Sequence, residues 1–168
     1  FSFACNGMNI KDIAHLRFKD IEEDRIIFFR SKTLNTSKAN LKPITVYLND
    51  YSLSIIKKYG NENKEPKSLV FDILEEGLSA HQERTKIKVF TRFINQHIKK
   101  LASANDITEK ISTYWARHSF ATSAIRKGAS MEFMQESLGH KNLKTTQNYF
   151  AGFDNETKKE FAQTLMDF

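Results

Sequence analysis

The 168-residue sequence predicts a mostly helical domain of the α+β class, with a small antiparallel β-sheet near its N-terminus. Three observations lead to this prediction. Apolar residues recur every three to four positions over most of the chain, and β-rich runs gather in its first third. A hydrophobic content of 40% with 27% charged residues is typical of a folded globular protein. A chain of this length fits one domain.

The first half of the chain should contain both strands of the sheet. The spacing of Ile10, Ile13 and Leu16 predicts an amphipathic helix. Two β-rich runs follow and should pair antiparallel across a lysine-containing loop at 32–42. An Asn-Asp pair should cap the next helix, and Gly60 should end it. The predicted elements are a helix within 9–21, strands at 25–31 and 43–48, and a helix from 50 to 59.

The second half should be helical. Apolar residues at helical spacing predict a long helix, and Gly128 and Gly139 should end two later helices in the left-handed conformation. Ser130 is a typical N-cap. The predicted helices are 83–103, 114–127, 131–138 and a final amphipathic stretch at 155–168, anchored by Phe161, Leu165, Met166 and Phe168.

Charge and cysteine content limit the possible partners and location. The net charge of +6 and the sequence pI near 9.3 favour a polyanionic partner, most often nucleic acid. No apolar run is long enough to cross a bilayer, so no membrane role is expected. The single cysteine, Cys5, excludes an internal disulfide and suits a reducing compartment such as the bacterial cytoplasm. The first residue, Phe1, enters what reads as a helix, which predicts that an N-terminal part is missing.

Several chemistries have no sequence signature here. The chain has no Gly-rich phosphate loop and no G-x-S-x-G nucleophile elbow. Its five histidines form no H-E-x-x-H motif, and one cysteine cannot give zinc-finger spacing. The sequence therefore predicts no metal and no cofactor, and leaves chemistry carried out by side chains alone.

Four residues in the last third could carry that chemistry. The run "TYWARHSFAT" places Tyr114 and Arg117 on one helical face, near a helix N-terminus where a guanidinium can hold two phosphate oxygens. A Leu-Gly-His turn then fixes His140 at the end of the next helix. Tyr149 follows nine positions later among amides and threonines. Taken singly, these residues are typical of a surface arginine, a loop histidine and a packing tyrosine.

Their order resembles that of the tyrosine recombinase (phage integrase) family. The runs "ARHSFAT", "LGH" and "TTQNYF" match the family's later motifs, while "GMNIKDIAHLRFKDI" and "FRSKT" resemble its first catalytic box and its β-hairpin lysine. The resemblance extends from Gly7 to Phe150 and is greatest to integrases of mobile and conjugative elements. It implies the family's catalytic-domain fold over residues 1–168, without the N-terminal DNA-binding (core-binding) part and its first helix.

The resemblance also implies a reaction: site-specific DNA strand cleavage and rejoining through a 3′-phosphotyrosyl intermediate, without a cofactor. Tyr149 would be the nucleophile, and its polar sequence neighbourhood suits a side chain that must reach DNA. Arg117, His140 and Lys32 would be the cations of the site, with Lys32 protonating the leaving oxygen. The resemblance also places Tyr114 in the site, where its hydroxyl can donate to a phosphate oxygen but cannot act as a base near neutral pH, and it gives supporting positions to Asn9, Asp12 and His118.

Two positions depart from the family pattern. Asn9 stands where the family usually has its first arginine, and Tyr114 stands where a histidine usually opens the His-x-x-Arg motif. Loss of one preorganised donor to a transition-state oxyanion typically slows a reaction by about 10² to 10³. Lys11, Arg17 and Arg30 are candidates to replace the missing charge, in no order that the sequence can rank. Both departures leave open a DNA-binding module with impaired catalysis, and a type IB topoisomerase is a further alternative.

Double-stranded DNA is the expected partner. The basic residues expected to contact its backbone are Lys38, Lys42, Arg126, Lys127, Lys141 and Lys144. The final helix has two readings: it closes the core of its own chain, or it docks on a neighbouring protomer in a tetramer assembled on two DNA sites. The DNA target sequence, and the choice among integration, excision, inversion and resolution, depend on features outside these residues.

Overall fold

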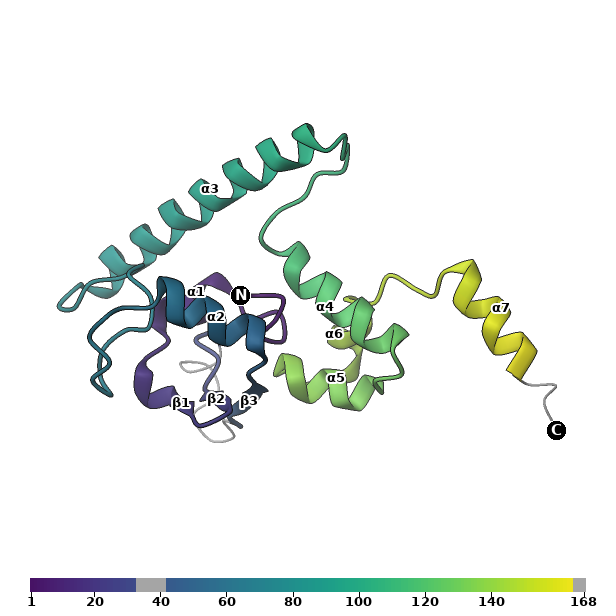
Figure 1. Ribbon diagram of the computed structural model, residues 1–168, viewed down its shortest axis with the longest axis horizontal. Helices are drawn as coiled ribbons and strands as arrows, with labels where there is room; N and C mark the ends of the chain where they lie inside the picture. Colours follow the sequence, from purple (N-terminus) through teal and green to yellow (C-terminus); the bar gives the residue numbers. More distant parts are fainter. Residues whose placement is uncertain (33–41, 165–168) are drawn as a thin grey trace.

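The computed structural model describes residues 1–32 and 42–164 (Figure 1). The fold is mostly helical with a small antiparallel sheet near the N-terminus, as predicted, although the sheet has three strands where two were expected. Its elements are α1 Ile10–His15, the 3₁₀ helix η1 Phe18–Asp20, β1 Ile21–Glu22, β2 Arg25–Phe28, β3 Ile44–Tyr47, α2 Asp50–Tyr59, α3 Ala80–Ala104, α4 Trp115–Arg126, α5 Met131–Leu138, α6 Leu143–Gln147 and α7 Asn155–Thr164. None of the helices in the described ranges is long and apolar enough to span a membrane.

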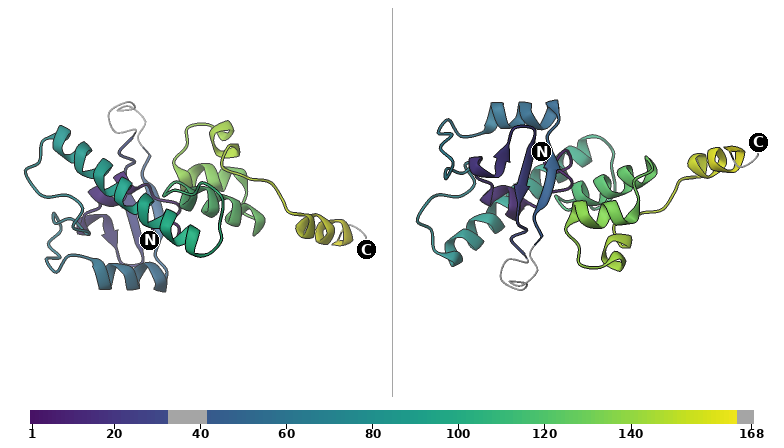
Figure 2. Two further views of the ribbon diagram at one scale, coloured as in Figure 1. Left: turned by 90° about the horizontal axis from the view of Figure 1, so that it is seen from above. Right: turned by 90° about the horizontal axis from the view of Figure 1, so that it is seen from below.

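The sheet holds the N-terminal core. Its strands pair in the order β1-β2-β3, with Ile26 opposite Val46, and both side chains are fully buried. Along β3, Thr45 and Tyr47 alternate with the buried positions and face solvent, the period-two pattern of a half-buried strand. The strands lie between α2 and α3 (Figure 2). We call the cluster of buried side chains around Ile26 and Val46 the N-terminal core.

The helix predicted within 9–21 is shorter than expected. It ends at His15, and Leu16 is already extended because its carbonyl oxygen accepts a hydrogen bond from the Val70 N–H at 2.8 Å. The residues after Leu16 form η1 and then β1, a third strand that the sequence pattern did not predict. A pairing with a segment more than fifty positions away thus overrides the local helical periodicity.

Other helix boundaries follow their capping residues. Helix α5 has the predicted bounds, with Ser130 accepting from a first-turn N–H and Gly139 closing the helix at φ +62°. Helix α3 begins earlier than predicted because Ser79 and Gln82 form a reciprocal capping box. Gly60 ends α2 with an extended backbone. The short helix α6 was not among the predicted elements, because it has too few residues to show a hydrophobic period.

A second cluster forms the C-terminal core, between α4, α5 and the residues that follow α6. Its buried members are Ala121, Ile125, Met134, Leu138 and Tyr149. Helix α7 stands apart from both cores (Figures 1 and 2) and contributes no buried residue. Phe161 is 66% exposed, so this helix does not close the core of its own chain. The expected anchors Leu165, Met166 and Phe168 lie outside the described residues.

Candidate active site

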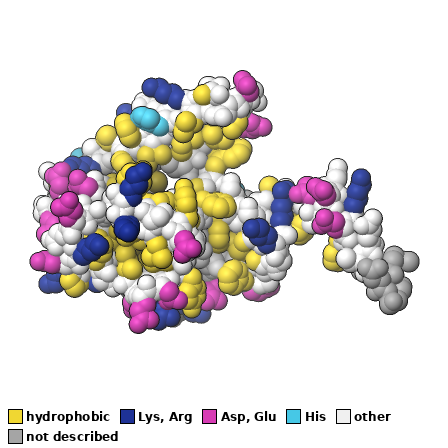
Figure 3. All heavy atoms as spheres, viewed as in Figure 1, with side chains coloured by type: hydrophobic (Ala, Val, Ile, Leu, Met, Phe, Trp, Pro, Cys, Tyr) yellow, Lys and Arg dark blue, Asp and Glu magenta, His cyan; other side chains and the backbone are white. Residues whose placement is uncertain are grey.

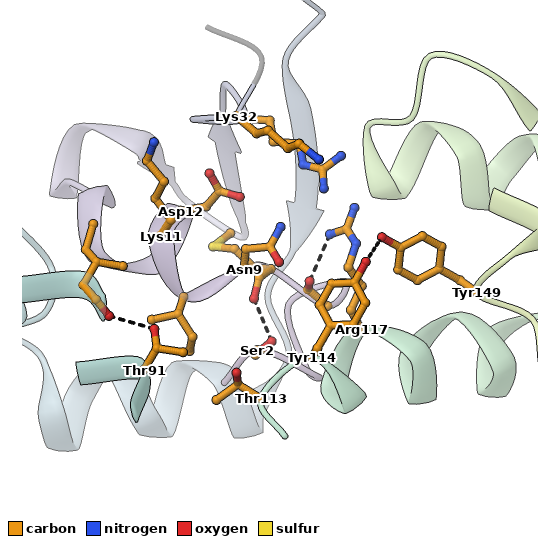
Figure 4. A pocket seen from close by; sticks show the side chains of 15 residues that line it. Ser2, Asn9, Lys11, Asp12, Lys32, Thr91, Thr113, Tyr114, Arg117 and Tyr149 are labelled. Carbon is orange, nitrogen blue, oxygen red and sulfur yellow. Dashed lines mark hydrogen bonds between the residues drawn. The ribbon is translucent and has the colours of Figure 1, made fainter. Parts of the chain in front are cut away.

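A pocket of about 420 Å³ lies where the two cores meet. Its walls come from both halves of the chain: the start of α1, the residues after β2, one side of α3, the start of α4, and Tyr149 (Figure 4). The polar and charged residues central to this lining are Asn9, Lys11, Asp12, Arg30, Lys32, Tyr114, Arg117 and Tyr149. Six predicted site residues are thereby brought together from positions far apart in the sequence.

Arg117 is the most buried charge of the site, with 4% of its surface exposed. Its guanidinium donates to the carbonyl oxygens of Gly7 (3.0 Å) and Leu138, and Nη2 lies 3.4 Å from Nε2 of His140. These partners are neutral, so they orient the cation without neutralising it. Burial, and then the charge of Arg30, lower the pKa of Arg117 to about 10, which leaves it cationic at neutral pH.

Gly7 is required for this placement of Arg117. Its φ of +64° lies in the left-handed region, and a Cβ added there would lie 2.7 Å from the Cα of Arg117. Only a residue without a side chain allows the two backbones to approach this closely. Gly7, at the start of the first motif, therefore makes room for Arg117 of the later motif.

His140 is buried and held by hydrogen bonds at both ring nitrogens. Its Nδ1 lies 3.0 Å from Oγ1 of Thr146, and Nε2 faces Arg117. Burial lowers its pKa to about 4, with further contributions from the charges of Arg117, Arg30 and Lys32. The expectation of a cation here is therefore wrong: near pH 7 His140 is a neutral imidazole, because protonation would add charge to a buried, already cationic cluster.

Tyr149 does not have the polar surroundings that its sequence neighbours suggested. It is 8% exposed and packs in the C-terminal core, while Gln147 and Asn148 face solvent. His118 stacks on its ring with centroids 4.7 Å apart and 25° between the planes, and the guanidinium of Arg117 lies 5.6 Å from the ring centroid. The ring of Tyr149 is thus held in place by His118 and Arg117.

The hydroxyl of Tyr149 meets that of Tyr114. A hydrogen bond joins the two phenols, which point toward each other from different elements (Figure 4). Tyr114 stands at the N-cap of α4, and the ring of His118 packs edge-on against it at 5.0 Å. Partial burial, followed by the hydrogen bond to Tyr149 and the charge on that residue, raises the pKa of Tyr114 to about 12.

Asn9 and Asp12 line the pocket from α1. Asn9 precedes the helix without capping it through its side chain. Asp12 is buried and accepts a hydrogen bond from the Ser31 N–H at 2.8 Å. This bond fixes the backbone between Arg30 and Lys32, the two cations that β2 delivers to the pocket.

The three candidates for the missing charge lie in different places. Arg30 lines the pocket, and its Nη1 reaches the carbonyl oxygen of Gly139 at 3.5 Å. Arg17 turns away, donating to the Lys67 carbonyl and pairing with Glu76 at 3.5 Å. Lys11 lines the same pocket with an exposed side chain.

The expected DNA contacts occupy several surfaces. The exposed ones are Lys42, Lys127, Lys141 and Lys144, while Lys38 lies outside the described residues. Arg126 pairs with Asp154 at 3.1 Å. In the described part of the chain, no three His, Cys, Asp or Glu side chains gather as a metal site would need.

A basic groove on α3 was not predicted. Its lining is entirely polar: Lys88, Thr91, Arg92, Asn95, Gln96 and Lys99. Thr91 also lines the active-site pocket, so the two hollows adjoin. The spacing of Lys88, Arg92 and Lys99, four and then seven positions apart, is the signal that could have found this surface.

Comparisons with known proteins identify the family of the chain. The model of the phage integrase family matches residues 4–156. A tyrosine recombinase of Thermosipho africanus is 31% identical over 150 residues, covering 89% of this chain and 47% of the relative. The chain spans less than half the length of the curated relatives it matches most strongly.

Two solved structures share the fold. The crystal structure of XerA recombinase has a TM-score of 0.63 at 20% identity, covering 99% of this chain and 56% of that one. XerH site-specific recombinase bound to a palindromic difH substrate, a post-cleavage complex, has a TM-score of 0.61 at 20% identity, covering 96% and 42%. With its motifs in the predicted order and its fold matched, the chain belongs to the phage integrase family of tyrosine recombinases.

Proposed function

We propose that this chain is the catalytic domain of a site-specific DNA recombinase that cleaves and rejoins strands through Tyr149. The observation that carries the proposal is the content of the pocket. Its described lining contains the hydroxyl of Tyr149, four cations (Lys11, Arg30, Lys32 and Arg117) and one carboxylate, Asp12. Such a lining fits an anionic group presented next to a nucleophile, as a DNA phosphodiester would be.

The reaction proceeds in two balanced steps. Oη of Tyr149 loses its proton and attacks phosphorus, forming the phosphotyrosyl bond as the bond to the 5′-oxygen breaks. Lys32 gives a proton to that leaving oxygen, and a 5′-hydroxyl later attacks the phosphotyrosyl bond to rejoin a strand. The phosphodiester energy is kept in the covalent intermediate, so no nucleotide cofactor is needed. Arg117 holds the phosphate oxygens, and His140, being neutral, contributes a hydrogen bond and no charge.

Arg30 supplies the positive charge that Asn9 cannot provide. It lies close enough to Arg117, His140 and Tyr114 to influence the pKa of each. Arg17 is committed to an ion pair elsewhere, and the ammonium of Lys11 lacks the planar fork that grips two phosphate oxygens. A guanidinium from the end of β2 thus takes the place of one from the start of α1.

DNA is the proposed substrate, double-stranded and bound through its backbone. The adjoining groove of Lys88, Arg92 and Lys99 on α3 extends the positive surface away from the pocket. The post-cleavage XerH complex with its DNA substrate supports the same use of the fold. Because each neutralised phosphate releases counterions, affinity should fall steeply with salt.

Assembly on DNA is proposed to use α7. The side chain of Phe161 on this helix is exposed to solvent, and Phe153 in the preceding segment is 44% exposed. Figure 3 shows α7 as a separate, largely polar arm beside the body. Docking of this arm on a neighbouring protomer would bury its apolar residues, giving a tetramer on two DNA sites.

A trapping experiment tests the proposed function. Covalent adducts recovered from cells under denaturing conditions, and sequenced at the protein-linked 3′ end, would identify the DNA site. A nicked suicide substrate carrying that site would then be incubated with the full-length protein, with its Tyr149→Phe variant, and with Tyr59→Phe as a matched control on the exposed surface of α2. We expect a shifted band on a denaturing gel with the wild type and the control, and none with Tyr149→Phe.

The alternatives give different results in the same experiment. Site binding without any adduct would overturn the enzyme proposal and leave a DNA-binding module. An adduct formed by a monomer that relaxes supercoils without exchanging partner strands would instead indicate topoisomerase activity. An adduct that survives Tyr149→Phe would exclude this residue as the nucleophile.

A further inference from the structure

The hydroxyl of Tyr149 has an unusual neighbour for a nucleophile that must lose a proton. Its hydrogen bond in the structure is to the hydroxyl of Tyr114, and the described residues provide no hydrogen bond from it to an imidazole or a carboxylate. His118 and His140 lie beside the ring, with centroids 4.7 and 4.9 Å away. The nitrogens of His140 are engaged by Thr146 and Arg117. The local group that can act on the attacking oxygen is therefore a second phenol.

A second phenol has one useful property here. It can donate a hydrogen bond to a phenolate while remaining protonated itself. Tyr114 is placed to do so, because its hydroxyl already hydrogen-bonds that of Tyr149, and partial burial favours its neutral form by raising its pKa to about 12. The guanidinium of Arg117, 5.6 Å from the ring centroid of Tyr149, adds a favourable charge for the ionised ring. The pair thus stabilises negative charge on the oxygen that attacks.

We infer that Tyr114 is a catalytic residue acting on the nucleophile: it donates a hydrogen bond to Oη of Tyr149 and holds that oxygen as a phenolate aimed into the pocket. This inference rests on the proposed function and goes beyond a donor to the phosphate, the role that its motif position suggests. The proton of Tyr149 passes to water through the open pocket, the Oη–P bond forms, the bond from phosphorus to the 5′-oxygen breaks, and that oxygen takes its proton from Lys32. In rejoining, Tyr149 leaves as a phenolate and receives the same hydrogen bond.

Because cleavage and rejoining are the reverse of each other, the role of Tyr114 predicts how both rates change. A donor that stabilises the phenolate both as nucleophile and as leaving group accelerates cleavage and rejoining by the same factor. Removing the Tyr114 hydroxyl should slow both steps about 10- to 100-fold at neutral pH, the usual contribution of a hydrogen bond to an ion. The cleavage equilibrium, measured as the fraction of adduct on a reversible substrate, should stay unchanged.

The pH dependence separates this role from a structural one. Single-turnover cleavage by the full-length protein would be measured from pH 6 to pH 10 on the suicide substrate, for the wild type, Tyr114→Phe and Tyr51→Phe. The last is a control whose exposed phenol lies on α2, away from the pocket. For Tyr114→Phe we expect a large defect at low pH that narrows as pH rises, because ionisation of Tyr149 then needs less help. A loss of equal size at every pH would overturn the inference.

A sulfur substitution separates the nucleophile from the leaving group. A substrate with a 5′-bridging sulfur expels a thiolate, which needs no proton, so a defect in leaving-group protonation disappears on it. The Tyr114→Phe defect should persist on this substrate, whereas a Lys32→Ala defect should shrink. Rescue of Tyr114→Phe by sulfur would overturn the inference. Tyr114→His, which restores the family's usual residue and a ring donor, should recover part of the rate.

Failure of the proposed function is distinguishable from failure of this inference. If the wild type forms no adduct, the proposed function fails and the inference fails with it. If the wild type forms the adduct and Tyr114→Phe matches it in rate at every pH, only the role of Tyr114 is wrong. Thermal melts of each variant show whether a slow protein is still folded.

Discussion

The N-terminal core delivers its functional groups differently from the C-terminal core. From the sheet side come Arg30 and Lys32, placed at the end of β2, with Lys32 exposed to solvent. From the helical side come Arg117, His140 and Tyr149, which are between 4% and 9% exposed. The helical half thus fixes the proposed nucleophile and its immediate partners by packing. The sheet half presents charge to whatever enters the pocket, so the proposed reaction would depend on how the two cores are joined.

Two guanidinium hydrogen bonds cross the joint between the cores. Arg117 donates to the carbonyl oxygen of Gly7 in the N-terminal half, and Arg30 reaches that of Gly139 in the C-terminal half. Each bond places a guanidinium of one core against a left-handed glycine of the other. Changes on either side of this joint should therefore affect the rate in different ways.

The largest effect is expected when the sheet side loses Arg30. Arg30→Ala should slow single-turnover cleavage by about 10² to 10³, because a charge aimed at the phosphate oxygens is removed. Arg30→Lys should recover only part of the rate, since an ammonium lacks the bidentate fork. Arg17→Ala is the matched control, because this arginine pairs with Glu76 outside the pocket.

A second change tests whether Arg30 truly stands in for Asn9. Adding Asn9→Arg to Arg30→Ala restores the family's usual arginine, and should raise the cleavage rate above that of Arg30→Ala alone. Equal cleavage rates for Arg30→Ala and the wild type would show that a residue other than Arg30 supplies the positive charge.

A somewhat smaller effect on the cleavage rate is expected when the contact between Gly7 and Arg117 is displaced. Gly7→Ala forces the Cα of Arg117 away, and a displacement of this kind costs about 10²-fold in rate. Gly77→Ala is the control, since Gly77 has φ +80° but nothing within 4 Å of its added Cβ. Both variants should lose stability through backbone strain, and only Gly7→Ala should lose cleavage. Parallel losses of rate in the two variants would mean that strain, and not the joint, is what matters.

The buried histidine of the helical side should make stability depend on pH. The pKa of His140 is lowered from its ordinary 6.5 to about 4 in the folded state, so between these values the unfolded chain binds the extra proton. Stability is therefore fully present above pH 6.5 and declines as pH falls toward 4, by up to roughly 3 kcal/mol. Urea titrations over this range should show a flatter dependence for His140→Gln than for the exposed control His81→Gln. An unchanged slope would contradict the buried, neutral state of His140.

The smallest effect on the isolated chain is expected at α7. Phe161→Ser should change the free energy of unfolding by less than about 0.5 kcal/mol, because the side chain is 66% exposed. Its consequence should appear only in assembly, as weaker association of DNA-bound protomers in analytical ultracentrifugation. Phe133→Ser, at another exposed phenylalanine on α5, should leave association unchanged.

Local signals predicted much of this fold. Helix α5 was predicted to the residue because Ser130 and Gly139 mark its two ends by their own conformational preferences. The helix predicted within 9–21 was too long because the bond between Leu16 and Val70 has no local signal. The ends of α5 were therefore predictable from its cap and its glycine, whereas the start of α3 at Ser79 and the end of α1 at Leu16 were not.

The site shows the same division. The order of motifs brought Arg117, Tyr149 and Lys32 to attention, and the structure places all three at one pocket. The contact between Tyr114 and Tyr149 joins residues 35 positions apart, and no spacing rule could have shown it. The burial of Tyr149 was likewise hidden, since its polar neighbours in sequence face solvent. Which side of a short helix faces the core is decided by the tertiary packing.

The segment after the nucleophile has a mechanical consequence. Residues 150–154 connect Tyr149 to α7, and Arg126 holds the end of this strap through Asp154 and the Gly152 carbonyl oxygen. An exposed ion pair of this kind contributes at most about 1 kcal/mol, whereas the ring of Tyr149 is packed in a core. A force on α7 would therefore break the ion pair between Arg126 and Asp154 before it displaces the packed ring of Tyr149. In the proposed assembly, α7 would thus change its angle to meet a neighbouring protomer while Tyr149 keeps its position.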